Sequence, residues 1–211
     1  MTVDQVIKEV EKDRSFYFTS GGGVTLGGGE PLFQAEFAKN ILKRCKSKGI
    51  HTAIETSGCG TWNDFEGILP YVDWIFYDIK VFDAGEHRKF TGVSNEQILD
   101  NARKISVAIQ NRGIHLIVRI PVVPGINNSK KNIAQTAEFV KRHMPSAVEI
   151  EILKYHSLAL GKYEALGEEY LLANAAQPSE EEMLEIKESI TKLGLHCRYE
   201  GAAAEVYVGV R

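Results

Sequence analysis

The sequence predicts an α/β fold, an incomplete (β/α) barrel in which parallel strands alternate with helices. Short apolar runs alternate along the chain with segments of helical periodicity, which is the pattern of strand–helix–strand units. Five strands are too few for a closed barrel of eight, and the first predicted element is a helix with no strand before it. The strands are nearly continuous apolar runs, as expected for parallel strands that are covered by helices on one side and packed on the other. No linker or repeat divides the chain, so we expect one domain over residues 1–211.

The order of the elements follows from periodicity and from residues that begin or end helices. Apolar residues at helical spacing over 3–10 follow Thr2, which predicts a capping box with Gln5. Pro31 is suited to the first position of the next helix and Gly49 to its end. The same reasoning predicts strands over 24–26, 50–55, 74–79, 114–120 and 147–153, with helices near 62–69, 95–110 and 130–143 between them.

A last helix is predicted between Ser179 and Gly194. Ser179 and Glu182 have the spacing of a second capping box, and Gly194 is suited to the residue that ends a helix. No strand is predicted after this helix, so we expect a sheet of the five strands given above.

Charge and composition exclude several classes of protein. The net charge is −3 at pH 7 and no long run of Lys or Arg occurs, so no nucleic-acid partner is expected. No apolar run is long enough to span a bilayer and no signal peptide is evident, so we expect no membrane association and a cytoplasmic location. Cys45, Cys59 and Cys197 are too far apart in sequence for a disulfide framework or a metal-ligand cluster, which predicts free thiols.

Polar side chains or glycines follow every predicted strand at its C-terminal end, where α/β folds place their binding residues. Together they would form a ring of mixed charge at one mouth of the barrel. Such a ring suits a zwitterionic ligand with a nucleoside part, because acids and carbonyls bind its amine, basic groups bind its carboxylate and glycines allow close approach. The residues are Gly28, Gly29, Glu30, Glu55, Thr56, Ser57, Asp78, Lys80, Arg119 and His156, and Ile79 lies between Asp78 and Lys80.

Each of these residues also has an ordinary structural explanation. Glycine-rich strand ends are often tight turns, and no Gly-Lys-Ser/Thr follows to make a phosphate-binding loop. Asp78 and Lys80 point to the same side of an extended strand, where a structural ion pair would account for them. Arg119 could neutralise Glu55 or Asp78. A lone histidine such as His156 is more often a satisfied, partly buried residue than a catalytic one.

Six motifs, in order along nearly the whole chain, resemble one family. They are GGGVTLGGGEPLFQ, ETSG, YDIK, HRKFTG, RIPVVPGINN and YHSLALGKYEALGEEY. They are similar to the radical S-adenosylmethionine (SAM) enzymes that activate glycyl radical enzymes, the family that includes the activator of pyruvate formate-lyase. The resemblance implies a partial barrel of the radical SAM type. It also implies an oxidoreductase that uses the reductive cleavage of SAM to generate a glycyl radical on a partner enzyme.

The resemblance assigns roles by position. Residues 28–30 match the motif whose backbone edge receives the methionyl amino group of SAM. Residues 78–80 match an Asp-x-Lys segment that contacts the adenosyl and methionine parts. Arg119 matches a carboxylate-binding arginine, and His156 matches a ribose or adenine contact.

A second set of positions is implied less directly. Thr56 and Ser57 line the same mouth, and Glu55, Thr56 and Asp78 could together hold a monovalent cation. The earlier glycines, 21–23, match no such role and are interpreted as a turn into the strand.

Two departures from the family pattern stand out. Gly27 occupies a position that is normally Ser, next to the predicted ligand edge. More importantly, the family holds a [4Fe–4S] cluster with a Cys-x-x-x-Cys-x-x-Cys motif, and this sequence contains none. We therefore expect a truncated radical SAM domain that lacks its first strand and cluster loop, keeps the SAM-binding body and is inactive alone. The full-length protein would carry the cluster.

The resemblance implies two protein partners, and it leaves alternatives open. The partners are a glycyl radical enzyme, whose identity the sequence does not reveal, and an electron donor such as flavodoxin or ferredoxin. One alternative is a non-catalytic module that binds SAM or a partner protein. Another is an unrelated aldolase-type lyase with Lys80 as its amine nucleophile.

Overall fold

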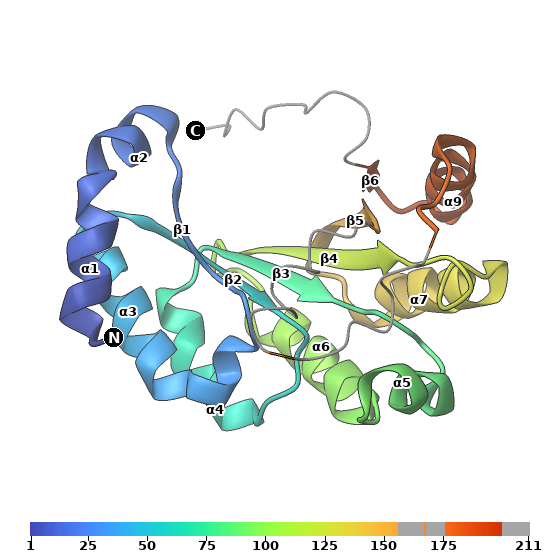
Figure 1. Ribbon diagram of the computed structural model, residues 1–211, viewed down its shortest axis with the longest axis horizontal. Coiled ribbons are helices and arrows are strands. Elements are labelled where there is room, and N and C mark those ends of the chain that lie inside the picture. Colours follow the sequence, from blue (N-terminus) through green and yellow to red (C-terminus); the bar gives the residue numbers. More distant parts are fainter. Residues whose placement is uncertain (156–166, 168–175, 200–211) are drawn as a thin grey trace.

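The computed structural model describes residues 1–155, 167 and 176–199, and these are arranged around one parallel sheet (Figure 1). Within the described part, six strands lie in the sequential order β1-β2-β3-β4-β5-β6, each parallel to its neighbour. This arrangement confirms the predicted α/β class. The strands are β1 (Gly23–Leu26), β2 (His51–Thr56), β3 (Trp74–Asp78), β4 (His115–Val122), β5 (Ala147–Lys154) and β6 (Cys197–Tyr199).

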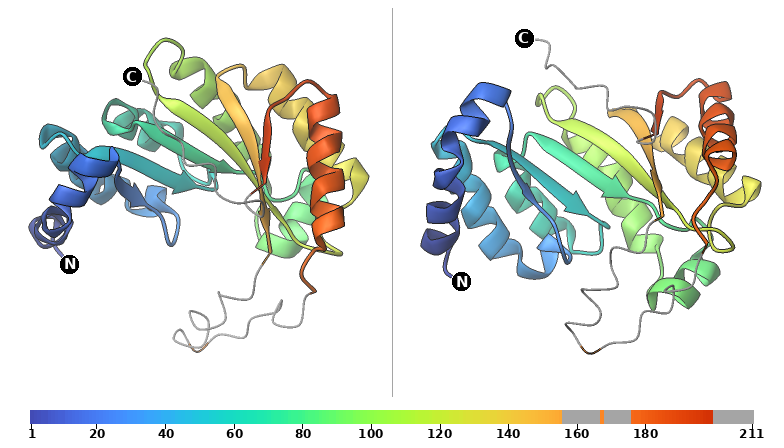
Figure 2. Two further views of the ribbon diagram at one scale, coloured as in Figure 1. Left: turned by 90° about the horizontal axis from the view of Figure 1, so that it is seen from above. Right: turned by 45° about the horizontal axis from the view of Figure 1, so that its top comes forward.

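Helices cover the outer side of the curved sheet, because each strand-to-strand crossover turns in the same sense (Figure 2). The opposite, inner side is where the strand-end residues gather. The helices are α1 (Val3–Lys12), α2 (Arg14–Ser20), α3 (Ala35–Ser47), α4 (Trp62–Ile68), α5 (Ala84–Thr91), α6 (Glu96–Ala108), α7 (Lys130–His143) and α9 (Glu180–Lys192), with short 3₁₀ turns at Pro31–Gln34 and Leu69–Tyr71.

The predicted helix starts are largely confirmed. The Thr2 hydroxyl accepts a hydrogen bond from the Gln5 backbone N–H, and the Gln5 side chain accepts one from the Thr2 N–H at 2.7 Å. Ser179 caps α9 by accepting from the Glu182 N–H at 3.1 Å. The Glu182 carboxylate, however, accepts from the Asn128 side chain at 2.6 Å and so ties α9 to the loop before α7. Pro31 begins a 3₁₀ turn that leads into α3.

The main core lies between the sheet and the helix layer. Ile54, Ile75, Leu116 and Ile150 point from successive strands toward the helices and are completely buried. Burial of each such side chain stabilises the fold by about 1.5–3 kcal/mol. A smaller cluster joins α1 to the same layer through Ile7, which packs with residues of α3 and the following turn.

Two features of the sheet correct the sequence-based expectation. A sixth strand, β6, pairs with β5 through Ile150 and Cys197, and three residues are too few for a periodic signal. The inner face is also more polar than expected. Glu149 and Glu151 lie within the run AVEIEIL, which was interpreted as apolar, yet both glutamates face inward and are buried.

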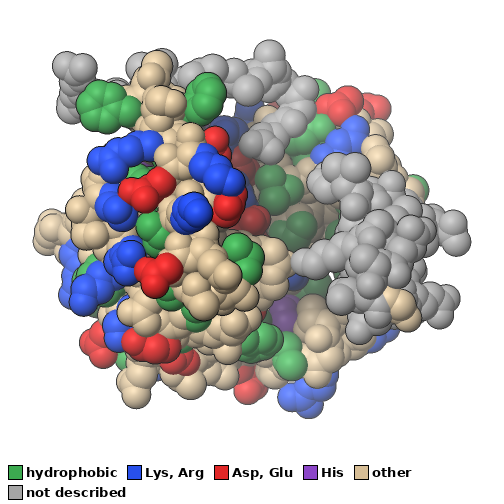
Figure 3. Space-filling model, turned by 60° about the vertical axis from the view of Figure 1, so that its left-hand side comes forward, with side chains coloured by type: hydrophobic (Ala, Val, Ile, Leu, Met, Phe, Trp, Pro, Cys, Tyr) green, Lys and Arg blue, Asp and Glu red, His purple; other side chains and the backbone are tan. Residues whose placement is uncertain are grey.

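The surface over the N-terminal helices carries interspersed charges of both signs (Figure 3). Lys48, at the end of α3, pairs with Glu11 of α1 at 2.7 Å, and Arg44 of α3 pairs with Asp4 of α1 at 3.1 Å. Exposed pairs of this kind stabilise a fold by only about 0–1 kcal/mol each. Among the described helices, none has both the length and the apolar character needed to cross a membrane.

Candidate functional site

The sheet register brings charged residues of four strands into one row on the inner face. Asp78 on β3 is paired with Arg119 on β4, Arg119 with Glu151 on β5, and Glu151 with Arg198 on β6. Inward-facing side chains of parallel neighbours lie side by side, so the four groups interact across the sheet. Glu55 on β2 joins the row through its contact with Arg119.

The glycines after β1 form an open backbone edge. Gly28 has a φ of +99°, a conformation that few residues other than glycine adopt. A Cβ atom at Gly28 or Gly29 would meet no atom within 4 Å, whereas one at Gly27 would lie 3.0 Å from Glu55 Oε2. This edge therefore offers main-chain groups to a ligand without obstruction by side chains. A cavity of about 200 Å³ lies beside it against α3.

Glu30 is committed to contacts within the protein. Its Oε1 accepts hydrogen bonds from the Thr56 hydroxyl at 2.7 Å and from the Leu32 N–H at 3.2 Å. Its Oε2 accepts from the N–H and the hydroxyl of Ser57 at 2.8 and 2.7 Å. The carboxylate thus joins the ends of β1 and β2. Its position indicates that Glu30 shapes the glycine edge by fixing the chain that follows β1.

The Asp78–Lys80 segment lies at the C-terminal end of β3. Asp78 Oδ1 is buried and makes no hydrogen bond within the described residues, while Oδ2 lies 3.9 Å from Lys80 Nζ. Burial, opposed chiefly by the charge of Lys80, raises the pKa of Asp78 to about 6. Ile79 is buried, and its N–H donates to the Arg119 carbonyl at 2.9 Å. A buried carboxylate oxygen without a partner is suited to receive a cationic or hydrogen-bonding ligand group.

Lys80 has an environment that favours an ion pair. Its side chain is 45% exposed and lies beside the Asp78 carboxylate. An amine nucleophile of the aldolase type is activated by an apolar pocket or by a neighbouring cation. The described surroundings of Lys80 provide an anion instead, so they favour the binding role over the nucleophilic alternative.

Arg119 is held on three sides. Its Nε donates to Glu151 Oε2 at 2.5 Å, and its Nη1 donates to Glu55 Oε1 at 2.9 Å. The guanidinium carbon lies 3.8 Å from the centre of the Phe76 ring. Stacking on an aromatic face leaves the edge of the guanidinium for hydrogen bonds. Of the two carboxylates that Arg119 could neutralise, Glu55 is the one that it pairs with, and the contact with Glu151 was not anticipated.

The row continues as a chain of charges toward β6, in which Glu149 and Glu151 are buried. Glu151 also contacts Arg198 Nη2, and Arg198 Nε donates to Glu149 Oε1 at 3.1 Å. His196 Nδ1 lies 3.0 Å from Glu149 Oε2. Sequence reasoning missed these residues. The signal that could have identified them is the alternation of the two glutamates with apolar residues in AVEIEIL.

Three asparagines fix the chain that follows Lys80. Asn127 Nδ2 donates to the Lys80 carbonyl at 2.6 Å and to the Pro121 carbonyl at 2.5 Å. Asn95 Nδ2 donates to the Val81 and Phe82 carbonyls, and Asn132 Oδ1 accepts from the Phe82 N–H. All three side chains are buried. The motif RIPVVPGINN therefore ties the ends of β3 and β4 together, a role that sequence reasoning did not assign.

One predicted binding residue and the cysteines fall outside this arrangement. His156 lies outside the described residues. Cys45 and Cys197 are buried, and burial raises the pKa of the Cys197 thiol to about 12. Among the described residues, no group of three or more His, Cys, Asp or Glu side chains could hold a metal ion. The described cysteines therefore do not fit a [4Fe–4S] cluster, and the predicted cation site near Glu55 stays a prediction.

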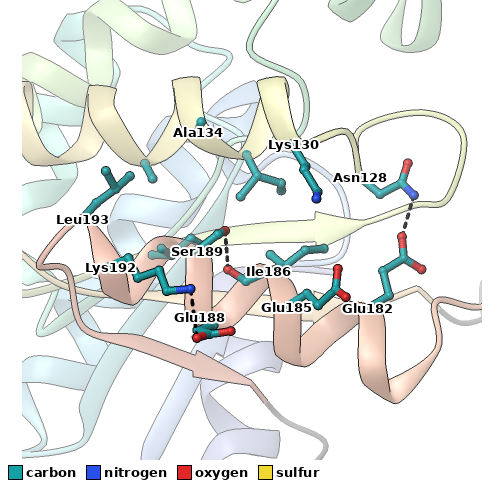
Figure 4. A pocket seen from close by; sticks show the side chains of 13 residues that line it. Asn128, Lys130, Ala134, Glu182, Glu185, Ile186, Glu188, Ser189, Lys192 and Leu193 are labelled. Atoms are coloured by element: carbon teal, nitrogen blue, oxygen red, sulfur yellow. Dashed lines mark hydrogen bonds and ion pairs between the residues drawn. The ribbon is translucent and has the colours of Figure 1, made fainter.

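A larger hollow of about 600 Å³ lies away from the strand ends, between α7 and α9 (Figure 4). Ile133 and Ala137 of α7 and Ile186 of α9 line it, and Lys192 pairs with Glu188 beside it. No residue of the predicted site lines this hollow. It belongs to the helix layer and is separate from the candidate site.

Comparison with known proteins identifies the family of the chain. The model of the Radical SAM superfamily matches residues 1–140. The (2S)-3-sulfopropanediol dehydratase activating enzyme of Klebsiella oxytoca is 36% identical over 201 residues, which are 93% of this chain and 62% of that protein. The trans-4-hydroxy-L-proline dehydratase activating enzyme of Clostridioides difficile is 40% identical over 189 residues, 88% of this chain and 61% of that protein.

A solved structure shows the same relationship. The crystal structure of a domain of pyruvate-formate lyase-activating enzyme from Bacteroides vulgatus has a TM-score of 0.70 and 32% sequence identity, and the match covers 85% of this chain and 99% of that one. The chain spans less than two thirds of the length of the curated relatives just named. It belongs to the radical SAM superfamily and, within it, to the family of glycyl radical enzyme activating enzymes.

Proposed function

We propose that this chain is the SAM-binding body of an activating enzyme that generates a glycyl radical on a partner enzyme. The observation that carries the proposal is the meeting of the open glycine edge with Arg119 and Asp78 at the inner ends of β1, β3 and β4. An amino acid with a cationic centre would find all of its complementary groups there. Family membership gives this ligand its identity, because the radical SAM superfamily uses SAM and a [4Fe–4S] cluster.

The residues present fit SAM. The main chain at Gly28 and Gly29 would receive the amino group, because the space beside both glycines is open, with no atom within 4 Å of an added Cβ. Arg119 and Lys80 would bind the carboxylate through charge-assisted hydrogen bonds. The unpartnered Oδ1 of Asp78 would accept a hydrogen bond from the ligand or stabilise its positive charge.

The work of these residues would be binding and orientation. In this family, SAM and a reduced [4Fe–4S] cluster together supply the radical that removes a hydrogen atom from a glycine of the partner. The protein holds the ligand in one orientation and excludes water, which accelerates such a reaction without acid–base catalysis. Since the described cysteines do not fit the cluster, no step is assigned to them.

Isothermal titration calorimetry with SAM tests the binding role. The purified chain is expected to bind SAM, and Arg119→Lys is expected to weaken binding by about tenfold, because a lysine cannot reproduce the edge contacts of a guanidinium. Arg142→Lys is the matched control, since Arg142 is exposed on α7 and pairs only with Glu138 in the described structure. Equal SAM affinity in both variants, or no binding to the wild type, would contradict the proposal.

The proposal also covers the protein partner and the electron donor. The relatives named above activate dehydratases of different substrates, and the related structure is a domain of a pyruvate-formate lyase-activating enzyme. We assign a glycyl radical enzyme as the partner class, with flavodoxin or ferredoxin as the electron source. Electron paramagnetic resonance of anaerobic cells that express the gene with a candidate partner is the test. A glycyl radical doublet that depends on this gene would support the assignment.

A second candidate is a SAM-binding module without radical chemistry. The dispersed positions of the described cysteines favour it, because they form no group of three or more possible metal ligands among the described residues. Iron and sulfide analysis of the protein isolated from its native cells under anaerobic conditions separates the two candidates. About four irons per chain would support the activating enzyme. SAM binding without iron would support the module.

A further inference from the structure

We propose that Phe76 is a positioning residue, whose ring holds the Arg119 guanidinium in the orientation in which it receives the carboxylate of the ligand. This inference rests on the proposed function, in which Arg119 binds the carboxylate of SAM. The guanidinium carbon lies 3.8 Å from the centre of the Phe76 ring. At this distance the ring attracts the cation and covers one of its two faces.

The Arg119 side chain crosses a strand, and the Phe76 ring lies against it. In the sheet register, Phe76 on β3 is paired with Glu55 on β2 and with Ile117 on β4. Arg119 follows Ile117 by two residues and so projects from the same face of β4. Its Nη1 nevertheless donates to Glu55 at 2.9 Å, on a strand roughly 10 Å from its own. The side chain therefore extends over β3, where the Phe76 ring supports it.

The ring fixes the guanidinium without using any of its hydrogen-bond donors. A guanidinium has five N–H groups. Glu151 accepts from Nε and Glu55 from Nη1, so three N–H groups on Nη1 and Nη2 make no hydrogen bond within the described residues. Phe76 fixes the plane of the guanidinium through its face and leaves these donors unused. A ligand carboxylate can therefore bind to the Nη edge while Phe76, Glu55 and Glu151 all stay in place.

A stack of rings on the inner face of the sheet orients Phe76. The ring centres of Trp74 and Phe76 are 6.4 Å apart with 22° between the ring planes, and those of Trp74 and His115 are 4.3 Å apart with 20° between the planes. Stacked arrangements of this kind are favourable for aromatic side chains. Trp74 and Phe76 also line a cavity of about 190 Å³, and both residues are half-buried. Phe76 is therefore oriented by these rings and by the arginine rather than by close packing in the main core.

Isothermal titration calorimetry on the purified chain tests this role with two ligands. Phe76→Leu keeps an apolar side chain but removes the ring, and it is expected to weaken SAM binding about three- to tenfold, the range for loss of a partly desolvated cation–π contact. The affinity for decarboxylated SAM should stay unchanged, because that ligand has no carboxylate for Arg119 to bind. A loss of affinity confined to SAM is a result that a merely structural role of Phe76 would not give.

Two further variants separate the ring from other effects of the substitution. Phe76→Tyr keeps the aromatic face and should retain the wild-type affinity for SAM. Phe139→Leu is the matched control, because Phe139 also lies against an arginine, with the Arg103 guanidinium carbon 4.9 Å from the centre of its ring, but belongs to α7 in the helix layer. This control should leave the affinity for SAM unchanged. Thermal unfolding of each variant, measured alongside, shows that it is folded.

Four outcomes would overturn the inference. They are an unchanged affinity of Phe76→Leu for SAM, an equal loss of affinity for SAM and decarboxylated SAM, a loss in Phe76→Tyr as large as that in Phe76→Leu, and a comparable loss in Phe139→Leu. If the wild type binds SAM and Arg119→Lys weakens binding, these results remove the positioning role of Phe76 alone. If the wild type binds no SAM, or Arg119→Lys leaves the affinity unchanged, the proposed function itself fails and this inference fails with it.

Discussion

Glu30 and Ser57 are joined by two hydrogen bonds, since the N–H and the hydroxyl of Ser57 both donate to Glu30 Oε2, at 2.8 and 2.7 Å. The two residues follow β1 and β2 respectively, so one carboxylate fastens the C-terminal ends of neighbouring strands. This contact fixes the glycine edge relative to the rest of the candidate site. The position of the edge therefore depends on a side chain that need not touch the ligand.

Glu30→Ala is predicted to lower the free energy of unfolding by about 2–3 kcal/mol, because several donors lose their acceptor. Urea unfolding followed by circular dichroism measures the change. Glu66→Ala is the control, since Glu66 is exposed on α4 and lies outside the site. Equal stability of the two variants would show that the strand ends do not depend on Glu30.

Asp78 should make stability depend on pH. Its pKa in the folded protein is about 6, above the ordinary value of 3.8, so the folded state binds this proton more tightly than the unfolded state. The contribution of Asp78 is therefore most favourable below pH 4 and is lost as the pH rises through 6. Asp78→Asn is predicted to be more stable than the wild type above pH 6 by about 2–3 kcal/mol.

The measurement is urea unfolding of wild type and Asp78→Asn from pH 5 to pH 8. The difference in unfolding free energy between them should grow as the pH rises. Asp100→Asn, on the exposed face of α6, controls for loss of a charge. A difference that stays constant across this range would show that Asp78 keeps an ordinary pKa in the folded protein.

Gly58 is predicted to tolerate no side chain. Its φ is +78°, and a Cβ there would overlap the Tyr77 hydroxyl, which donates to the Ile98 carbonyl at 2.6 Å. Gly58→Ala should cost about 1–2 kcal/mol for the left-handed backbone and a further ~2 kcal/mol for the overlap. Gly113→Ala is the matched control, because Gly113 has a φ of +68° but an added Cβ would meet nothing within 4 Å. Thermal unfolding should show the larger loss for Gly58.

Asn127→Asp is predicted to destabilise the ends of β3 and β4. The substitution replaces the amide group that donates to the Lys80 and Pro121 carbonyls with a carboxylate oxygen that repels them. The expected loss is about 3 kcal/mol, since the site is buried. Asn111→Asp, exposed and at a φ of +63°, should change stability by about 0.5 kcal/mol at most. Similar losses of unfolding free energy in the two variants would show that Asn127 does not hold the ends of β3 and β4 together.

Much of the fold could be predicted because the strands and caps have strong local signals. The five predicted strands are all present, and the Thr2 cap has the expected hydrogen bonds. The convergence of Glu55 and Arg119 was foreseen because the ends of parallel strands meet at one edge. Strand β6 and the inward direction of Glu151 were missed, since a three-residue strand has no period and a glutamate inside an apolar run gives a weak signal.

The contacts that Asn127 and Asn132 make with the ends of β3 and β4 were missed for a different reason. Asn127 and Asn132 contact main-chain groups, and such contacts depend on where loops pass in space rather than on residue pairing. The segment PVVPG ends at Gly125, whose positive φ is typical of a turn. This turn places Asn127 next to the end of β3.

The charged row from Asp78 to Arg198 has a consequence for protein engineering. Arg119, Glu151 and Arg198 within it are paired with charged side chains on neighbouring strands rather than on their own strands. A chimaera that imports β5 alone from a relative would bring a foreign complement of charges between two resident arginines. Exchanges that keep β4, β5 and β6 together should be tolerated, and this block is the natural unit for recombination.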